Sequence, residues 1–188
     1  MSDELNHVMK ARREKLDALV AAGAAPFAYF FDRSHGCGDA ARLLGDAEEG
    51  PAVRLAGRIV AWRGHGKTIF AHLADDTGRI QLYFRKDQLP DDLFALLAHF
   101  DLGDVIGVHG PLFRTRTGEV TVRVDEATML AKSLRPLPFG KEEVVDGRTI
   151  RHSGFADGEQ RSRQRYADLA VHPDVRRLFA ARSRMTTA

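Results

Sequence analysis

The sequence predicts a mainly β domain with flanking helices, and three observations support this prediction. From Val53 onward apolar and polar residues alternate, whereas the chain on either side has the spacing of amphipathic helices. Short glycine-rich or polar turns separate the alternating runs. One helical pattern, LPDDLFALLAHF, stands between the third and fourth runs. With 188 residues, 44% of them hydrophobic, the chain can form one packed domain with a tail, or one domain and part of another.

The N-terminal residues 1–50 are predicted to form a helical extension. Apolar residues recur at helical spacing over residues 3–22, and GAAP then ends the helix, with Gly23 as its C-terminal glycine. A second, short helix is predicted within DAARLLGDAEEG, residues 39–50.

Three strands follow this extension. In VRLAGRIVAW, the first strand, the alternation places Val53, Leu55 and Ile59 on the inner face and Arg54, Arg58 and Trp62 on the outer face. KTIFAHLADDTGRIQLYFRK, residues 67–86, contains the next two strands around a turn. Their apolar faces hold Ile69, Ala71, Leu73, Ile80, Leu82 and Phe84.

Phe70 falls on the polar face of the second strand. If the three strands pair as a meander, Phe70 becomes a neighbour of Arg58 and Gln81 on one surface. An aromatic ring there can stack on a nucleic-acid base, the Gln81 amide can donate to and accept from the base edge, and Arg58 can add a cation–π or phosphate contact. The alternative is that another element, such as the N-terminal helix, covers Phe70.

The remaining patterns complete a five-stranded arrangement. A helix is predicted over residues 90–100, and DVIGVHGPLFRT and GEVTVRVDEATML then read as two strands joined by a tight polar turn. Three strands, a helix and two strands is the order of the OB-fold barrel, whose second and third strands and neighbouring loops bind oligonucleotides. The sequence therefore predicts a five-stranded OB-fold barrel over residues 53–132.

The C-terminal part has a different character. Residues 133–156, with two prolines in RPLPFG and many charges, are predicted to be a linker. Residues 157–188 are predicted to form a helical hinge segment of two helices, the second beginning near Pro173.

Charge and composition narrow the classes of function. The net charge is only +2, but residues 54–86 contain seven Lys or Arg and two Asp, which is the pattern of a polyanion-binding surface. The single cysteine, Cys37, excludes an internal disulfide and favours a reducing compartment. The eight histidines show no metal-ligand spacing, and no segment has the length and apolar character of a membrane span. We expect a cytoplasmic protein without a metal site.

Several segments, among them GRIVAWRGHGKTIFAHLADDTGRIQLYFRKDQL, LGDVIGVHGPLFRTRTGEVTV and SLRPLP, together resemble the N-terminal part of a class II lysyl-tRNA synthetase, a lysine–tRNA ligase. The resemblance implies an anticodon-binding domain that contacts the anticodon stem-loop of tRNA(Lys). Phe70 would stack on the middle uridine and Gln81 would bond its edge, with Arg58 and Glu119 beside them. Four basic residues are predicted as phosphate contacts, namely Arg63, Lys67, Arg79 and Arg116.

The chain also departs from this family's pattern. His72 stands where an acidic or small polar residue is common, and Ser162 where tyrosine is usual. We find no catalytic residues: the adenylate-forming motifs, with their ATP and magnesium, would belong to a catalytic domain beyond this sequence. The resemblance therefore implies an aminoacyl-tRNA ligase of protein biosynthesis that is a homodimer when full length, and a 188-residue chain that is inactive alone and binds no cofactor.

Three alternatives fit the same residues. The first is the equivalent part of an aspartyl- or asparaginyl-type synthetase. The second is a stand-alone OB module that binds single-stranded nucleic acid without anticodon preference. The third is a structural role in dimer contacts.

Overall fold

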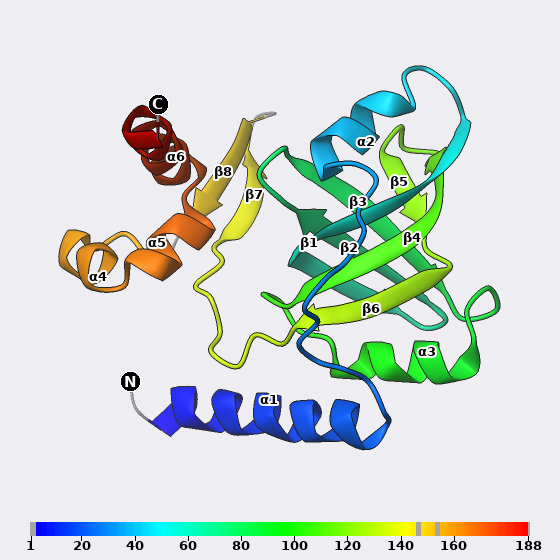
Figure 1. Cartoon of the computed structure of the whole chain (residues 1–188), viewed down its shortest axis with the longest axis horizontal. Helices are drawn as coiled ribbons and strands as arrows, with labels where there is room; N and C mark the ends of the chain where they lie inside the picture. The colour runs from blue at the N-terminus through cyan, green and yellow to red at the C-terminus, as the bar shows by residue number, and fades with distance from the viewer. Residues whose placement is uncertain (1–2, 146–147, 153–154, 188) are drawn as a thin grey trace. The chain divides into compact units, whose positions relative to one another are not determined.

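The computed structural model describes residues 3–145, 148–152 and 155–187. The chain divides into two compact units, Met1–Pro136 and Leu137–Ala188, and each is described separately (Figure 1).

A closed sheet forms the centre of the first unit. Its order is β1-β2-β3-β5-β4-β6, and β1 also pairs with β4, so that five strands close into a ring. Pairing is antiparallel except between β3 and β5, which run parallel. The strands are β1 (Glu49–His65), β2 (Thr68–Ala74), β3 (Arg79–Arg85), β4 (Val105–Arg114), β5 (Val120–Arg123) and β6 (Glu126–Ala131). The predicted OB fold is therefore confirmed.

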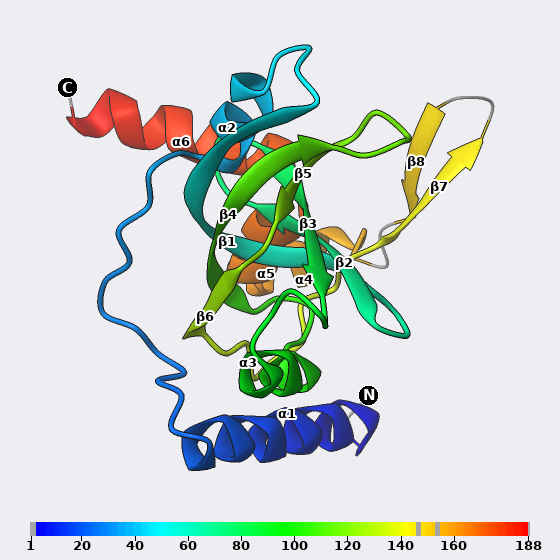
Figure 2. The same cartoon turned by 90° about the vertical axis from the view of Figure 1, so that its right-hand side faces the viewer.

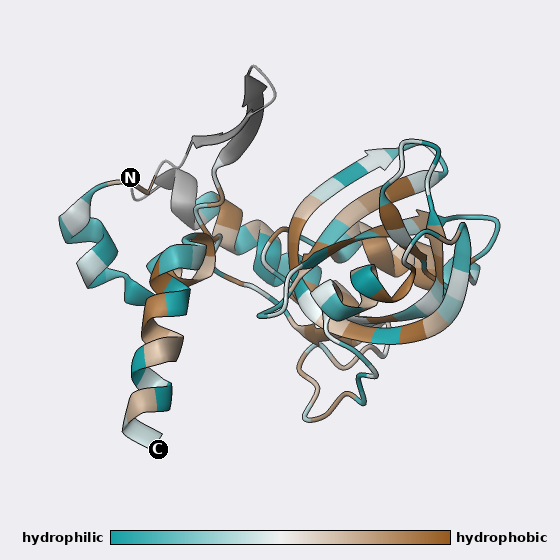
Figure 3. Ribbon diagram, turned by 90° about the horizontal axis from the view of Figure 1, so that it is seen from above, coloured by the Kyte–Doolittle hydropathy of each residue, from teal (hydrophilic) through white to brown (hydrophobic). Residues whose placement is uncertain are grey.

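The core of the ring consists of the apolar residues that the alternation placed on the inner faces. Leu55, Leu73, Leu82 and Phe84 are fully buried, and Figure 3 shows polar and apolar residues alternating along the strands. The last predicted strand is in fact two strands, β5 and β6: β5 pairs with β3 and β4, and β6 continues along β4 alone.

Trp62 corrects the predicted facing of the first strand. The sequence placed it on the outer face, but the pairing of β1 with β2 shifts register between Ile59 and Ala61. A bulge of this kind reverses the facing of every later residue. Trp62 consequently packs on the core, with its ring centroid 5.6 Å from that of Phe84.

Helices cover one end of the ring. The helix α3 (Asp91–Leu96) continues as the 3-10 turn η1 (Leu97–His99) and leads into β4. Figures 1 and 2 show α1 (Asp3–Ala21) at the same end of the sheet as α3. The α1 helix ends near Gly23, whose φ of +78° is a conformation that glycine adopts without strain.

Buried polar contacts fix α1 to the ring. The Arg12 guanidinium donates to the carbonyl oxygens of Leu102 (3.0 Å) and Ser133 (2.6 Å). The Lys15 ammonium lies 2.6 Å from Asp101, whose carboxylate also accepts from the fully buried Lys132 at 2.6 Å. The buried Lys132 ammonium thus has a partner of opposite charge, and the buried Arg12 guanidinium is satisfied by carbonyl oxygens, as burial of polar groups requires.

The short helix α2 (Cys37–Leu43) packs against the turn between β2 and β3. The backbone N–H of Cys37 donates to Asp75 and that of Gly38 donates to the Thr77 hydroxyl, both at 2.8 Å. A β-carbon on Gly38 would overlap the carbonyl oxygen of Thr77, so this approach requires glycine. The helix begins two residues before the segment in which the sequence predicted it.

The second unit contains a hairpin that the sequence did not predict. The hairpin β7 (Lys141–Val145) and β8 (Arg148–His152) lies in the segment predicted as a linker. Three helices follow, α4 (Gly158–Arg163), α5 (Arg165–Val171) and α6 (Pro173–Thr187), so the first predicted helix is interrupted at Gln164. The buried carboxylate of Asp168 accepts from Arg161, Arg165 and His172 and ties α4 to α5.

Within the residues that the structure describes, no helix has the length and apolar character needed to cross a membrane.

Candidate nucleic-acid interface

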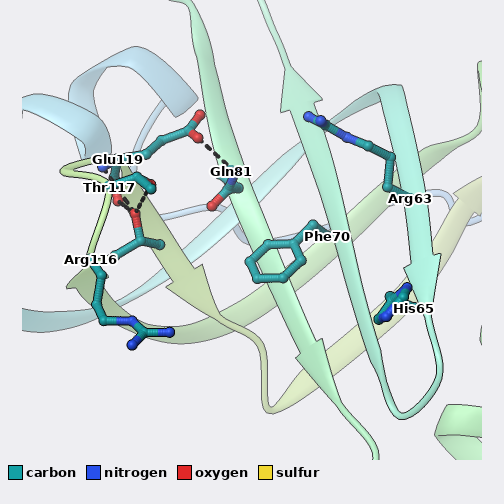
Figure 4. Close-up of a pocket in the computed structure, with 8 residues that line it drawn as sticks. Arg63, His65, Phe70, Gln81, Arg116, Thr117 and Glu119 are labelled. Atoms are coloured by element: carbon teal, nitrogen blue, oxygen red, sulfur yellow. Dashed lines mark hydrogen bonds between the residues drawn. The ribbon is translucent and has the colours of Figure 1, made fainter.

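A pocket of about 430 Å³ opens on the outer face of β2 and β3 (Figure 4). The β1–β2 turn borders one side and the β4–β5 turn borders the other. These are the strands and loops with which OB folds bind nucleic acids. The pocket is lined by Arg63, His65, Phe70, Gln81, Thr115, Arg116, Thr117 and Glu119.

The Phe70 ring forms the apolar part of the pocket. Strand pairing sets Phe70 opposite both Arg63 on β1 and Tyr83 on β3. The Tyr83 ring supports it from β3, with centroids 4.9 Å apart and planes tilted by 38°. Phe70 is half-buried and lines the pocket, so α1 does not cover it. A ring held on one side and accessible from another is suited to stacking on a planar ligand.

Gln81 lines the pocket and is nearly buried, with both ends of its amide engaged. It is 8% exposed; its Nε2 donates to Glu119 Oε2 at 2.7 Å, and its Oε1 accepts from the Thr121 hydroxyl at 2.8 Å. An ionised carboxylate only accepts hydrogen bonds, so the Glu119 contact fixes which end of the amide faces β4–β5. These two contacts use one of the two N–H donors and one of the two carbonyl lone pairs of Gln81.

Glu119 comes from the turn that joins β4 to β5. Three hydrogen bonds between Thr115 and Glu119 close the turn. Thr115 N–H donates to the Glu119 carbonyl at 3.0 Å, Glu119 N–H donates to the Thr115 hydroxyl at 3.0 Å, and that hydroxyl donates to the Glu119 carbonyl at 3.2 Å. Gly118, with φ of +86°, allows the chain to reverse there. The second carboxylate oxygen of Glu119, Oε1, lies 2.9 Å from His72 Nε2 on β2. The carboxylate thus joins the turn to both central strands.

Charges of both signs border the pocket. Arg63 and His65 lie on the β1 side, and Arg116 and Glu119 lie on the opposite side, with their side chains pointing in different directions (Figure 4). Two guanidinium groups on opposite sides of an aromatic ring can contact the phosphates on either side of a stacked base.

The structure brings most of the predicted site residues together. Phe70, Gln81 and Glu119 line one pocket, as do two of the predicted phosphate contacts, Arg63 and Arg116. The other two, Lys67 and Arg79, are exposed but do not line it.

Arg58 is not the neighbour of Phe70 that the sequence predicted. It pairs with Ala74, four residues along β2 from Phe70, a separation of about 13 Å along the strand. Its guanidinium donates to the Gly103 carbonyl oxygen at 2.6 Å. Alternation correctly indicated its face, but the register of the strands separates it from the pocket.

Sequence reasoning did not assign Thr115, Thr117 or Thr121 to the site. The signal for the first two was their position in the predicted turn RTRTG, between Arg114 and Glu119. No sequence signal pointed to Thr121, because its contact with Gln81 depends on the parallel pairing of β3 with β5.

Comparison with known proteins agrees with this geometry. Residues 53–130 match the family model described as OB-fold nucleic acid binding domain. The chain is 44% identical over 97% of its length to a lysine–tRNA ligase of Carboxydothermus hydrogenoformans, 41% identical over 98% to one of Staphylococcus epidermidis and 42% identical over 98% to one of Halalkalibacterium halodurans. It spans 35–37% of the length of these relatives.

Residues 53–130 therefore form an OB-fold domain of the nucleic-acid-binding class. Over nearly its whole length, the chain is homologous to the N-terminal part of the lysine–tRNA ligases.

Proposed function

We propose that this chain binds the anticodon stem-loop of a lysine tRNA, as the N-terminal part of an enzyme that attaches lysine to that tRNA during translation. The observation that carries the proposal is the pocket in which the Phe70 ring, the Gln81 amide and the Glu119 carboxylate face the same space. The homology to lysine–tRNA ligases supports it.

With a base placed so that its N3 faces Glu119 and its 4-position faces Gln81, the hydrogen-bonding groups of the pocket would favour uracil. Gln81 presents a remaining N–H donor and Glu119 presents carboxylate lone pairs beside it. The uracil edge offers a carbonyl acceptor next to the N3–H donor, which matches this pair. Cytosine offers an amino donor next to an unprotonated N3, which is the reverse pattern. Glu119 thus supplies an acceptor beside the amide of Gln81, which the sequence predicted as donor and acceptor.

The remaining features of the enzyme belong to this proposal as well. ATP and magnesium would act in the part of the ligase outside these 188 residues, and the intact protein would be a cytoplasmic homodimer. Lysine would reach the tRNA in that other part, while the OB domain selects the tRNA by its anticodon.

Affinity measurements with short RNAs test the proposal. The chain is titrated with fluorescent anticodon stem-loops that differ only in the middle base, UUU against UCU, and with a stem-loop of unrelated sequence. We expect tightest binding of UUU and a clear loss with UCU. Equal affinity for all three would overturn anticodon recognition and favour the non-specific single-strand-binding alternative, and no binding would exclude both.

A further inference from the structure

We propose that His72 is a positioning residue for base discrimination, which acts by holding the Glu119 carboxylate in its recognition geometry; this inference rests on the proposed function. His72 Nε2 lies 2.9 Å from Glu119 Oε1, and the His72 side chain is only 12% exposed. His72 is absent from the residues that line the pocket, so it influences a bound base through Glu119.

The strand register explains how His72 and Gln81 reach the same carboxylate. They are Cα partners on β2 and β3, and paired residues face the same side of the sheet. Gln81 Nε2 donates to Oε2 of Glu119, and His72 Nε2 meets Oε1. Because the ionised carboxylate can only accept, His72 carries its proton on Nε2 in this contact. Each carboxylate oxygen is therefore held by a donor from a different strand.

Glu119 needs this support because of where it lies. It belongs to a tight turn, and its side chain is 43% exposed. A glutamate on a turn loses side-chain freedom when it is held in one rotamer, and two donors offset that loss. Without His72 we expect the carboxylate to spend less time beside Gln81.

The expected consequence is specific to base selection. Stacking on Phe70 does not involve Glu119, so binding through the ring persists when His72 is changed. The donor–acceptor pair that distinguishes uracil from cytosine, in contrast, depends on where the carboxylate lies. If His72 had only a structural role, substituting it would instead lower the melting temperature of the chain and weaken the binding of both RNAs equally.

Two substitutions separate these cases. His72→Leu keeps apolar bulk and removes the donor, whereas His72→Gln keeps an N–H that can reach Glu119. The measurements are the ratio of affinities for UUU and UCU stem-loops and the melting temperature. We expect His72→Leu to reduce the ratio about tenfold, and His72→Gln to restore most of it. Should His72→Leu fail to fold, His72→Thr replaces it, since the threonine hydroxyl is too short to reach the carboxylate.

A double substitution completes the test. Once Glu119→Gln has removed the carboxylate, adding His72→Leu should leave the remaining ratio unchanged, because the two residues act through one contact. An unchanged ratio in the single His72→Leu variant, or a His72→Gln variant as poor as His72→Leu, would overturn the inference. If the unmodified chain bound the UUU and UCU stem-loops equally well, the proposed function would be overturned instead.

Discussion

Two phenylalanines on neighbouring strands have opposite environments. Phe70 on β2 lines the pocket and is half-buried, whereas Phe84 on β3 is fully buried and packs against Trp62. Both lie in segments of alternating apolar and polar residues, so only the face of the sheet distinguishes the ligand-binding role expected of Phe70 from the core-packing role expected of Phe84.

Phe70→Leu should weaken binding of the UUU stem-loop and leave the fold intact. Leucine keeps apolar volume but removes the plane on which a base stacks, a loss of roughly 1–3 kcal/mol in binding. Stem-loop affinity and thermal melting are measured on the same preparation. Phe84→Ala is the control and should lower the free energy of unfolding by about 3–5 kcal/mol. If Phe70→Leu lowers stability as much as Phe84→Ala, with binding per folded molecule unchanged, Phe70 is a core residue.

Single residues also show what the sequence could predict. Alternation placed Phe70, Gln81 and Arg58 on one face, and the structure agrees on that face. The position of a residue along that face depends on the register of the paired strands, and the bulge between Ile59 and Ala61 shifts the register of β1 against β2. Neither the distance of Arg58 from the pocket nor the packing of Trp62 against the core could be read from a period of two.

Secondary-structure elements were easier to predict than the contacts that fix them. The N-terminal helix and the five alternating runs all form, because each shows a strong period over many residues. The division between β5 and β6, and the docking of α2 on the β2–β3 turn, depend on distant partners. Sequence spacing carries no information about such partners.

Gly38→Ala tests the docking of α2. The new methyl group would overlap the backbone of Thr77, and backbone atoms cannot move aside as a flexible side chain can. We expect a loss of about 1–3 kcal/mol in the free energy of unfolding, measured by urea titration. Gly158→Ala is the matched control, since nothing lies within 4 Å of the position that its new β-carbon would take and its φ is not positive. Equal stability of the two variants would contradict the close approach.

The contact of α1 with the ring should depend on pH through Asp101. Burial alone would raise the pKa of Asp101, but hydrogen bonds and charges from Lys132 and Lys15 outweigh it and hold the pKa below its ordinary value of 3.8. The unfolded chain therefore binds this proton first as pH falls. The stabilisation is complete above the ordinary value and is lost as pH falls toward and through the lower folded pKa.

The pH dependence is checked by urea unfolding of the wild-type chain and Asp101→Asn between neutral pH and pH 3. We expect the variant to be less stable at neutral pH and to lose less stability in acid. Part of the acid loss should remain, because hydrogen bonds from Cys37, Thr77 and Gly78 outweigh burial and lower the pKa of Asp75 as well. Parallel curves for the two proteins would show that Asp101 has no such role.

For the molecule as a whole, the homology extends over nearly the entire chain but over only 35–37% of the relatives. In the residues that the structure describes, no three His, Cys, Asp or Glu side chains gather as a metal site would require. Because the proposed function assigns ATP and magnesium to the part of the ligase outside these 188 residues, we expect the isolated chain not to form lysyl-adenylate. The measurement is lysine-dependent pyrophosphate exchange with the purified chain. Exchange above the level of a boiled control would contradict the proposal that adenylate formation belongs to the other part of the ligase.

The affinity of the chain for RNA should depend on salt concentration. The chain carries a net charge of only +2, so attraction to RNA must come from local basic groups such as Arg63 and Arg116 at the pocket. Each phosphate contact releases counterions, so the logarithm of affinity should fall with the logarithm of salt concentration by about 0.7 per contact on single-stranded RNA.

Arg63→Gln and Arg116→Gln should each reduce this slope by the amount expected for about one phosphate contact. Arg42→Gln, on α2 and paired with Asp39, should leave it unchanged. If the affinity for the UUU stem-loop did not change with salt concentration, binding would not use the phosphates. Equal slopes in all three variants would show that the phosphate contacts lie away from the pocket.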